Sequence, residues 1–120
     1  MMIANDQAAT VFDRDTALSR VGGDVDLLRE IGVLFLQEYP PAVSELRTAV
    51  TERDPKRIER KAHSLKGSVS TFGAGPAFQA ALTLETQGRS GDLTQVETNL
   101  QDFEFSLARL CAEIQNLLAE

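Results

Sequence analysis

The stretch that decides the fold is DPKRIERKAHSLKGSVSTF, residues 54–72, because its apolar side chains recur at helical spacing. On a helix that begins at Asp54-Pro55, five of them fall within about 40° of one line along the axis. They are Ile58, Ala62, Leu65, Val69 and Phe72. Asp54 supplies an N-cap, and Pro55 stands at the first helical position, which tolerates a missing N–H. The stretch therefore predicts an amphipathic helix with one narrow buried face.

His63 is the only histidine in the chain, and the same helical geometry turns it toward solvent. It lies roughly 140° around the helix from Ile58, away from the buried face. Its neighbours on the helix surface are Glu59, Lys66, Gly67 and Ser70. An exposed imidazole can carry a covalently bound group, and a lysine three residues later can pair with phosphate. The alternative is a surface histidine without a role.

Gly67 is an unusual residue for the interior of a helix, where glycine costs about 1 kcal/mol relative to alanine. It lies one turn after His63. A backbone without a side chain at this point leaves room for a group added to the imidazole, or for another protein to approach closely. Gly67 therefore favours a functional role for this face.

Positive charge is concentrated on the same helix, although the chain as a whole has a net charge of −6. Residues 54–66 carry five basic and two acidic side chains, a net +3, and the rest carries seven basic and sixteen acidic, a net −9. The basic residues are Lys56, Arg57, Arg60, Lys61 and Lys66. Two interpretations stay open: chance clustering on a solvated face, or electrostatic steering toward phosphate or an anionic partner.

Length and composition exclude several classes of protein. With 120 residues, 42% hydrophobic and 25% charged, the sequence is typical of one soluble domain. It has no apolar run of about 18 residues and no signal peptide, so we expect a cytoplasmic protein without membrane contact. One cysteine and one histidine cannot form a disulfide framework or a closed zinc site. An acidic chain also argues against a nucleic-acid partner.

We expect residues 1–10 to be a flexible lead-in and residues 11–120 to form a single helical domain. Asp13 or Asp15 would cap a short helix that stops at Gly22-Gly23. This helix would be an addition to the main bundle.

A longer helix is predicted from its N-cap Asp24 to about Arg53. Tyr39-Pro40-Pro41 must break or kink it, because Pro40 has no N–H and disfavours helical geometry at Tyr39. The two pieces would then form either separate helices or one bent rod. Its buried face is expected to comprise Leu27, Leu28, Ile31, Leu34 and Phe35.

Two more helices are predicted in the last third of the chain. Gly73-Ala74-Gly75-Pro76 ends the histidine helix, and a shorter helix runs from about Pro76 to Gln87. A turn at Gly88-Arg89-Ser90-Gly91 separates it from a last helix that begins at Asp92. That last helix has apolar residues at steps of three and four, namely Leu93, Val96, Leu100, Phe103, Leu107, Leu110, Ile114 and Leu117.

These elements predict an all-α fold: a four-helix antiparallel up-and-down bundle with a short additional N-terminal helix. No segment has the period-2 alternation of a strand. The regular apolar run at the end of the chain is also compatible with an intermolecular coiled coil. We prefer packing within a monomer, because the other helices have apolar faces that need to be covered.

The segment AHSLKGS, residues 62–68, resembles the signature of histidine-containing phosphotransfer (HPt) domains. The resemblance extends from about residue 11 to the end of the chain. The matching positions are Phe12-Asp13, Ala17-Leu18, Gly22-Gly23-Asp24, Leu27-Leu28 and Phe35 upstream, and Gly73-Ala74 and Leu84-Glu85 downstream.

The resemblance implies a role for each matched residue of the site. His63 would carry the phosphoryl group, Lys66 would stabilise it, and Gly67 would keep the imidazole accessible. Glu85 stands where some relatives have a glutamine that orients the ring by a hydrogen bond. Ser70 stands where many relatives have glycine, and it keeps the residue small.

The implied function is a phosphorelay intermediate. His63 would accept a phosphoryl group from a receiver-domain aspartate and pass it to another receiver, in response regulators or hybrid histidine kinases. The chain would bind no cofactor, since Mg²⁺ comes with the receiver, and it has no glycine-rich nucleotide loop. It would therefore not be a self-contained kinase or hydrolase. The expected docking surface is Arg60, Lys61, Ala62, Ser64 and Ser70, with Leu18 or Val21 from the first helix.

Two alternatives remain open from the sequence. The chain would be the phosphorylatable module of a histidine kinase if that kinase modifies His63 directly with ATP, and only the phosphoryl donor separates this case from the relay. A helical adaptor that binds a receiver or kinase without chemistry would instead keep its binding and output after the substitution His63→Gln.

Overall fold

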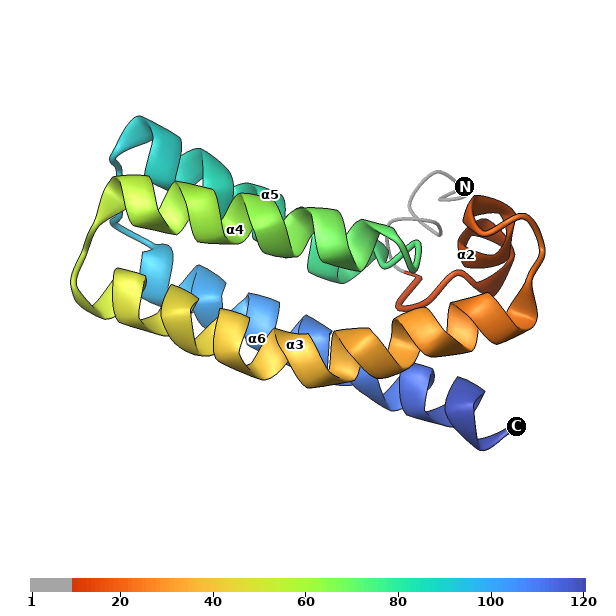
Figure 1. The fold of residues 1–120 in the computed structure, drawn as a ribbon. Coiled ribbons are helices and arrows are strands. Elements are labelled where there is room, and N and C mark those ends of the chain that lie inside the picture. Colours follow the sequence, from red (N-terminus) through yellow and green to blue (C-terminus); the bar gives the residue numbers. More distant parts are fainter. Residues whose placement is uncertain (1–9) are drawn as a thin grey trace.

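The computed structural model describes residues 10–120, and within this range the regular structure consists of five α-helices (Figure 1). In chain order they are α2 (Arg14–Arg20), α3 (Val25–Thr51), α4 (Pro55–Ser70), α5 (Gly75–Ser90) and α6 (Val96–Ala119). The all-α prediction is confirmed.

The four long helices form an antiparallel bundle in which each helix packs against the next one along the chain. The contacts run from α3 to α4, from α4 to α5 and from α5 to α6, and α6 closes the bundle against α3. Figure 1 shows α4 and α5 as one layer and α3 and α6 as the other. The short helix α2 packs on α3 at one end, as the additional N-terminal helix expected from the sequence.

Three aspartates cap the helices at the positions that the sequence predicted. The carboxylates of Asp13, Asp24 and Asp54 accept hydrogen bonds from backbone N–H groups three residues later, at the starts of α2, α3 and α4. Each bond satisfies one of the N–H groups that the first turn of a helix leaves without a partner. The aspartates therefore set where these helices begin.

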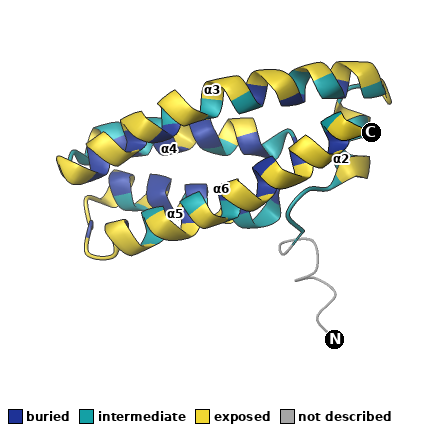
Figure 2. Cartoon of the chain, turned by 90° about the horizontal axis from the view of Figure 1, so that it is seen from below, coloured by how far each residue is buried: buried dark blue, intermediate teal, exposed yellow. Residues whose placement is uncertain are grey.

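The core is made by the apolar faces of all four long helices, as the buried residues in Figure 2 show. The predicted stripe of α4 is fully confirmed: Ile58, Ala62, Leu65, Val69 and Phe72 are at most 3% exposed. The apolar run at the end of the chain is buried against its own bundle, with only Leu100 partly exposed. The coiled-coil alternative is therefore not needed to cover this face.

The prolines do not break the second helix, because α3 continues through Pro40 and Pro41 to Thr51. Each proline removes one helical hydrogen bond, to the carbonyl groups of Leu36 and Gln37. Both prolines and Gln37 are exposed. This side of the helix faces solvent, so water can satisfy the carbonyl groups that lose their partners.

Other expectations for α3 and for the last two helices were wrong in detail. On α3, Leu27 and Leu34 are 40% and 52% exposed instead of buried. The predicted turn at 88–91 is instead the last part of α5, which ends with Gly91 in the left-handed conformation, φ 80°. The last helix begins at Val96, because Asp92 accepts hydrogen bonds from the backbone N–H and hydroxyl of Thr94 and so stabilises a turn.

The predicted lead-in, residues 1–10, lies outside the described residues except for Thr10, so the boundary at residue 10 stays a prediction. The backbone carbonyl of Thr10 accepts a hydrogen bond of 2.9 Å from the N–H of Gly75, and the N–H of Asp13 donates one of 2.9 Å to the carbonyl of Phe72. The start of the described chain is thereby fixed to the turn between α4 and α5. From residue 10 onward, none of the helices has both the length and the apolar character needed to cross a membrane.

Candidate functional site

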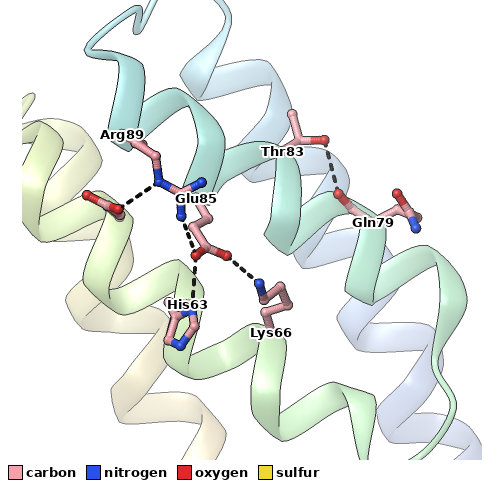
Figure 3. Close-up of polar contacts among 7 residues, drawn as sticks. His63, Lys66, Gln79, Thr83, Glu85 and Arg89 are labelled. Atoms are coloured by element: carbon pink, nitrogen blue, oxygen red, sulfur yellow. Dashed lines mark hydrogen bonds and ion pairs between the residues drawn. The ribbon is translucent and has the colours of Figure 1, made fainter.

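His63 lies on the outer face of α4, and its side chain is 67% exposed. Its ring is nevertheless held in one orientation by a residue of the neighbouring helix. The Nδ1 atom is 2.9 Å from Oε2 of Glu85 on α5, whose side chain is only 4% exposed (Figure 3). The sequence left open whether Glu85 contacts the ring, and the structure contains this hydrogen bond.

Glu85 also binds two permanent cations. Lys66 Nζ lies 2.7 Å from Oε1, and Arg89 Nη2 lies 2.8 Å from Oε2. Arg89 also reaches back to α4, where its Nε donates to Oε2 of Glu59 at 3.0 Å. The hydrogen bond from Lys66 holds the pKa of Glu85 below its usual value, against the opposing effect of burial and with a further contribution from His63. Glu85 is therefore an ionised carboxylate at neutral pH.

The charge of Glu85 determines which nitrogen of His63 is nucleophilic. An ionised carboxylate only accepts hydrogen bonds, so the proton of the neutral imidazole lies on Nδ1. The other nitrogen, Nε2, then has a free electron pair. Figure 3 shows that Nε2 points away from Glu85. The arrangement presents one oriented, unprotonated nitrogen at an exposed surface.

Gly88 on α5 makes this arrangement possible, because it allows the backbones of α4 and α5 to approach closely. A Cβ atom at Gly88 would lie 2.6 Å from both the N of Glu59 and the O of Pro55. Gly88 was expected in a turn, so its role in this close packing was missed. A detectable signal was present, since Gly88 continues the series of small or apolar residues Ala77, Ala81 and Leu84 at helical spacing.

Lys66 is less available than the sequence suggested. Its side chain is 20% exposed, its ammonium group pairs with Glu85, and it lies 5.8 Å from the centre of the Phe78 ring. In this conformation the ammonium group faces Glu85 and not His63 Nε2 (Figure 3). A phosphoryl group on Nε2 would therefore have to compete with Glu85 for Lys66.

Gly67 faces open space, since a Cβ atom built there would meet nothing within 4 Å. Within residues 10–120, no packing contact therefore requires glycine at this position. Ser70, one turn further, donates its hydroxyl to the carbonyl of Gly67 at 2.7 Å, and its own carbonyl accepts from Arg20 of α2. Ser70 thus links the end of α4 to α2, a structural contact that the sequence did not reveal.

The predicted docking residues divide into three groups. Arg60 and Ser64 are exposed and line a shallow groove of about 520 Å³ beside His63. Lys61 turns toward α3, where its ammonium group pairs with Glu45 at 2.9 Å. Ala62 was wrongly included, because it belongs to the buried stripe and is 0% exposed.

Leu18 and Val21, the apolar residues of α2 proposed for docking, are partly buried against the core. Glu59 and Arg89 complete the polar network around Glu85. Glu59 was expected beside His63, but neither residue was given a role in the site. The contact between Glu59 and Arg89 depends on the pairing of α4 with α5, which the sequence does not show. The one local signal was the spacing of Glu85 and Arg89 by one helical turn.

An exposed, oriented histidine on a four-helix bundle defines the class of histidine phosphotransfer domains. The sequence matches the family model described as Hpt domain over residues 30–120, and the chain belongs to this family. As an Hpt domain, the chain is a histidine phosphotransfer intermediate in phosphorelays. Domains of this family have receiver domains as their partners.

Comparison with individual proteins agrees with this assignment. The chain is 32% identical over 97 residues to the sensor protein TorS of Escherichia coli (strain K12). The match covers 81% of this chain and 10% of TorS, so the chain spans about a tenth of that curated relative. The crystal structure of histidine-containing phosphotransfer protein B (HptB) from Pseudomonas aeruginosa PAO1 superimposes with a TM-score of 0.82 at 21% identity, covering 90% of this chain and 94% of HptB. HptB therefore shares the fold.

Proposed function

We propose that His63 is the phosphoryl carrier, and that its Nε2 accepts the group from a receiver-domain aspartyl phosphate and passes it to the aspartate of another receiver. The observation that carries this proposal is the hydrogen bond from Nδ1 to the buried carboxylate of Glu85. It leaves Nε2 unprotonated and exposed. A nucleophile held in one orientation reduces the entropy lost in reaching the transition state.

The transfer step balances without removal of a proton. The free electron pair of Nε2 forms the new P–N bond, the P–O bond of the aspartyl phosphate breaks, and its electron pair leaves with the aspartate carboxylate. Nδ1 keeps its proton, so the phosphorylated ring becomes cationic. The negative charge of Glu85, 2.9 Å away, stabilises that cation. The reverse step, toward a second receiver, uses the same groups.

Other residues of the face support this step by charge and by access. Lys66 would leave Glu85 and bind the phosphoryl oxygens instead, so that one anionic partner of the lysine replaces another. Gly67 would leave space for the receiver to approach Nε2 closely. Mg²⁺ would be bound by the receiver, and the bundle would contribute positioning and charge neutralisation, the main requirements of phosphoryl transfer.

The test is transfer from a phosphorylated receiver domain, in the presence of Mg²⁺, to the unaltered protein and to the variant His63→Gln. We expect acid-labile labelling of the unaltered protein and complete loss in the variant. Ser68→Ala is the matched control, because Ser68 is also exposed on α4 but lies away from the groove beside His63.

The outcomes separate the relay from the alternatives. Labelling by a kinase and ATP, but by no phosphorylated receiver, would identify a module modified directly by a histidine kinase. Equal receiver binding by both proteins without any labelling would identify an adaptor. Labelling that survives in His63→Gln would show that another residue is the carrier.

A further inference from the structure

Only part of the basic cluster on α4 is available to an anion from outside. Three of its five cations are engaged within the chain: Arg57 with Glu52 at 3.3 Å, Lys61 with Glu45 at 2.9 Å, and Lys66 with Glu85 at 2.7 Å. In the part of the chain that the structure describes, Lys56 and Arg60 are the members of the cluster without an ion pair, and both are exposed.

Position distinguishes these two unpaired cations. Arg60 lies one helical turn before His63, where side chains three residues apart have Cβ atoms about 5–6 Å from each other. Arg60 and His63 line the same groove, together with Ser64 and Arg89. Lys56 lies two turns before His63, about 10 Å along the helix axis, and does not line this groove.

Arg60 and Lys66 each lie three residues from His63 on α4, and they are in opposite states. Lys66 must give up a buried carboxylate and its position beside Phe78 before it can bind a phosphoryl group on Nε2. Arg60 gives up no ion pair. Its guanidinium group also has the planar, forked arrangement of donors that binds two phosphate oxygens at once.

We propose that Arg60 is a catalytic residue of the transfer, which binds the oxygens of the phosphoryl group as that group joins and leaves Nε2 of His63. This inference rests on the proposed function and goes beyond it, because it assigns the immediate phosphate contact to Arg60 and a later or weaker one to Lys66. Arg60 forms and breaks no covalent bond. It stabilises negative charge on the group in transit.

The test uses two phosphoryl donors: a phosphorylated receiver domain and the small molecule phosphoramidate. With phosphoramidate in its N-protonated form, Nε2 attacks phosphorus, the P–N bond of the donor breaks, and its electron pair leaves with nitrogen as ammonia. No protein partner is present in that reaction, so an effect there reports contact with the phosphoryl group itself. The variants are Arg60→Gln, Arg60→Lys and Lys56→Gln, and His63→Gln supplies the background.

We expect Arg60→Gln to slow labelling about tenfold with both donors, the size of effect that losing one charge-assisted hydrogen bond produces. Arg60→Lys should recover part of the rate. Lys56→Gln removes the same charge from the same helix and should change the rate by less than about twofold, because an exposed charge at that distance is screened. In ³¹P NMR titrations, Arg60→Gln should raise the pKa of the phosphoryl group and Lys56→Gln should not.

Each alternative result overturns the assignment. Slowing with the receiver alone would place Arg60 at the protein interface instead of the phosphoryl group. Equal slowing by Arg60→Gln and Lys56→Gln would indicate general steering by the charge of the helix. Normal labelling of Arg60→Gln by both donors would overturn this inference and leave the proposed function intact, whereas absence of labelling in the unaltered protein would overturn both.

Discussion

Gly67 and Gly88 occupy the interiors of adjacent helices, and their surroundings are opposite. A Cβ atom at Gly88 would collide with the backbone of α4 at 2.6 Å, whereas one at Gly67 would meet nothing within 4 Å. Glycine costs each helix about 1 kcal/mol relative to alanine. At Gly88 the folded chain itself compensates through the close packing of α4 and α5. At Gly67 the folded chain contains no compensation.

The cause of a glycine that is unfavourable for helix formation can therefore lie either in the packing of the fold or in the function of the site. The region around Gly88 positions Glu85 against His63, so it serves the site through the fold. The region around Gly67 has open space, and we propose that it serves the site by admitting a phosphoryl group or a receiver domain from outside. Substitutions in the two regions should therefore separate stability from transfer.

The largest expected effect is that of Gly88→Val. The larger side chain must push α4 and α5 apart, because the atoms that it meets belong to the backbone and cannot rotate away. We expect a loss of about 3 kcal/mol in the free energy of unfolding, measured by urea denaturation. Gly91→Val is not a suitable control, since Gly91 has a positive φ, and Thr86→Val on the exposed face of α5 serves instead. An unchanged midpoint for Gly88→Val would contradict the close packing.

A smaller effect is expected for Glu85→Gln, which keeps a hydrogen-bond acceptor for His63 but removes the charge that pairs with Lys66 and Arg89. We expect the free energy of unfolding to fall by about 1 kcal/mol at neutral pH, and the rate of phosphoryl transfer to fall only a few-fold. Because the pKa of Glu85 is lowered on folding, chiefly by Lys66, its stabilising effect is present above the ordinary value of 4.5 and disappears as the pH falls through the lowered pKa.

Urea denaturation of the unaltered protein and of Glu85→Gln between pH 7 and pH 3 checks this dependence. The difference in stability between the two proteins should shrink as the pH falls. Glu59→Gln is the matched control, because Glu59 pairs with the same arginine but its side chain is 33% exposed. A difference that grows toward acid pH would show that the pKa of Glu85 is raised, not lowered.

An effect on stability of similar size but opposite sign is expected for Gly67→Ala. The added methyl group meets open space and improves helix propensity, so the free energy of unfolding should rise by about 1 kcal/mol. Transfer from a receiver should nevertheless slow, and Gly67→Gln should slow it further while leaving the bundle folded. Ser68→Gln adds a side chain at the next position, about 100° around the helix, and should not affect transfer. Normal transfer by Gly67→Gln would show that glycine is not needed for access.

The parts of the fold that the sequence predicted are those with local causes. The buried stripe of α4, the caps Asp13, Asp24 and Asp54, and the exposed His63 follow from helical periodicity and capping chemistry within a few residues. The hydrogen bond from His63 to Glu85 was left open by the sequence, and only the resemblance to a known family pointed to that position. Its geometric basis, the pairing of α4 with α5, is not local.

The errors arose where one residue type serves two purposes. Glycine ends helices and also permits close approach, so Gly88 was assigned to a turn. Proline breaks buried helices but is tolerated where water reaches the backbone, so of the two expectations for α3 only the break into separate helices was wrong. Ala62 was placed both on the buried face and on the docking surface, and the burial of its side chain removes the second assignment. In each case the packing of the helices against one another, or their exposure to water, decides which purpose the residue serves. Local sequence patterns do not reveal that packing.

The pairing of α4 with α5 also affects how the protein folds. His63 and Glu85 are 22 residues apart in sequence, and the two helices that carry them are joined by a short turn. Closing a short loop costs little entropy, and proteins rich in such local contacts fold rapidly. The nucleophile and the carboxylate that orients it therefore belong to one helical hairpin. Their contact can form as soon as that hairpin does, before the first and last long helices of the bundle complete the core.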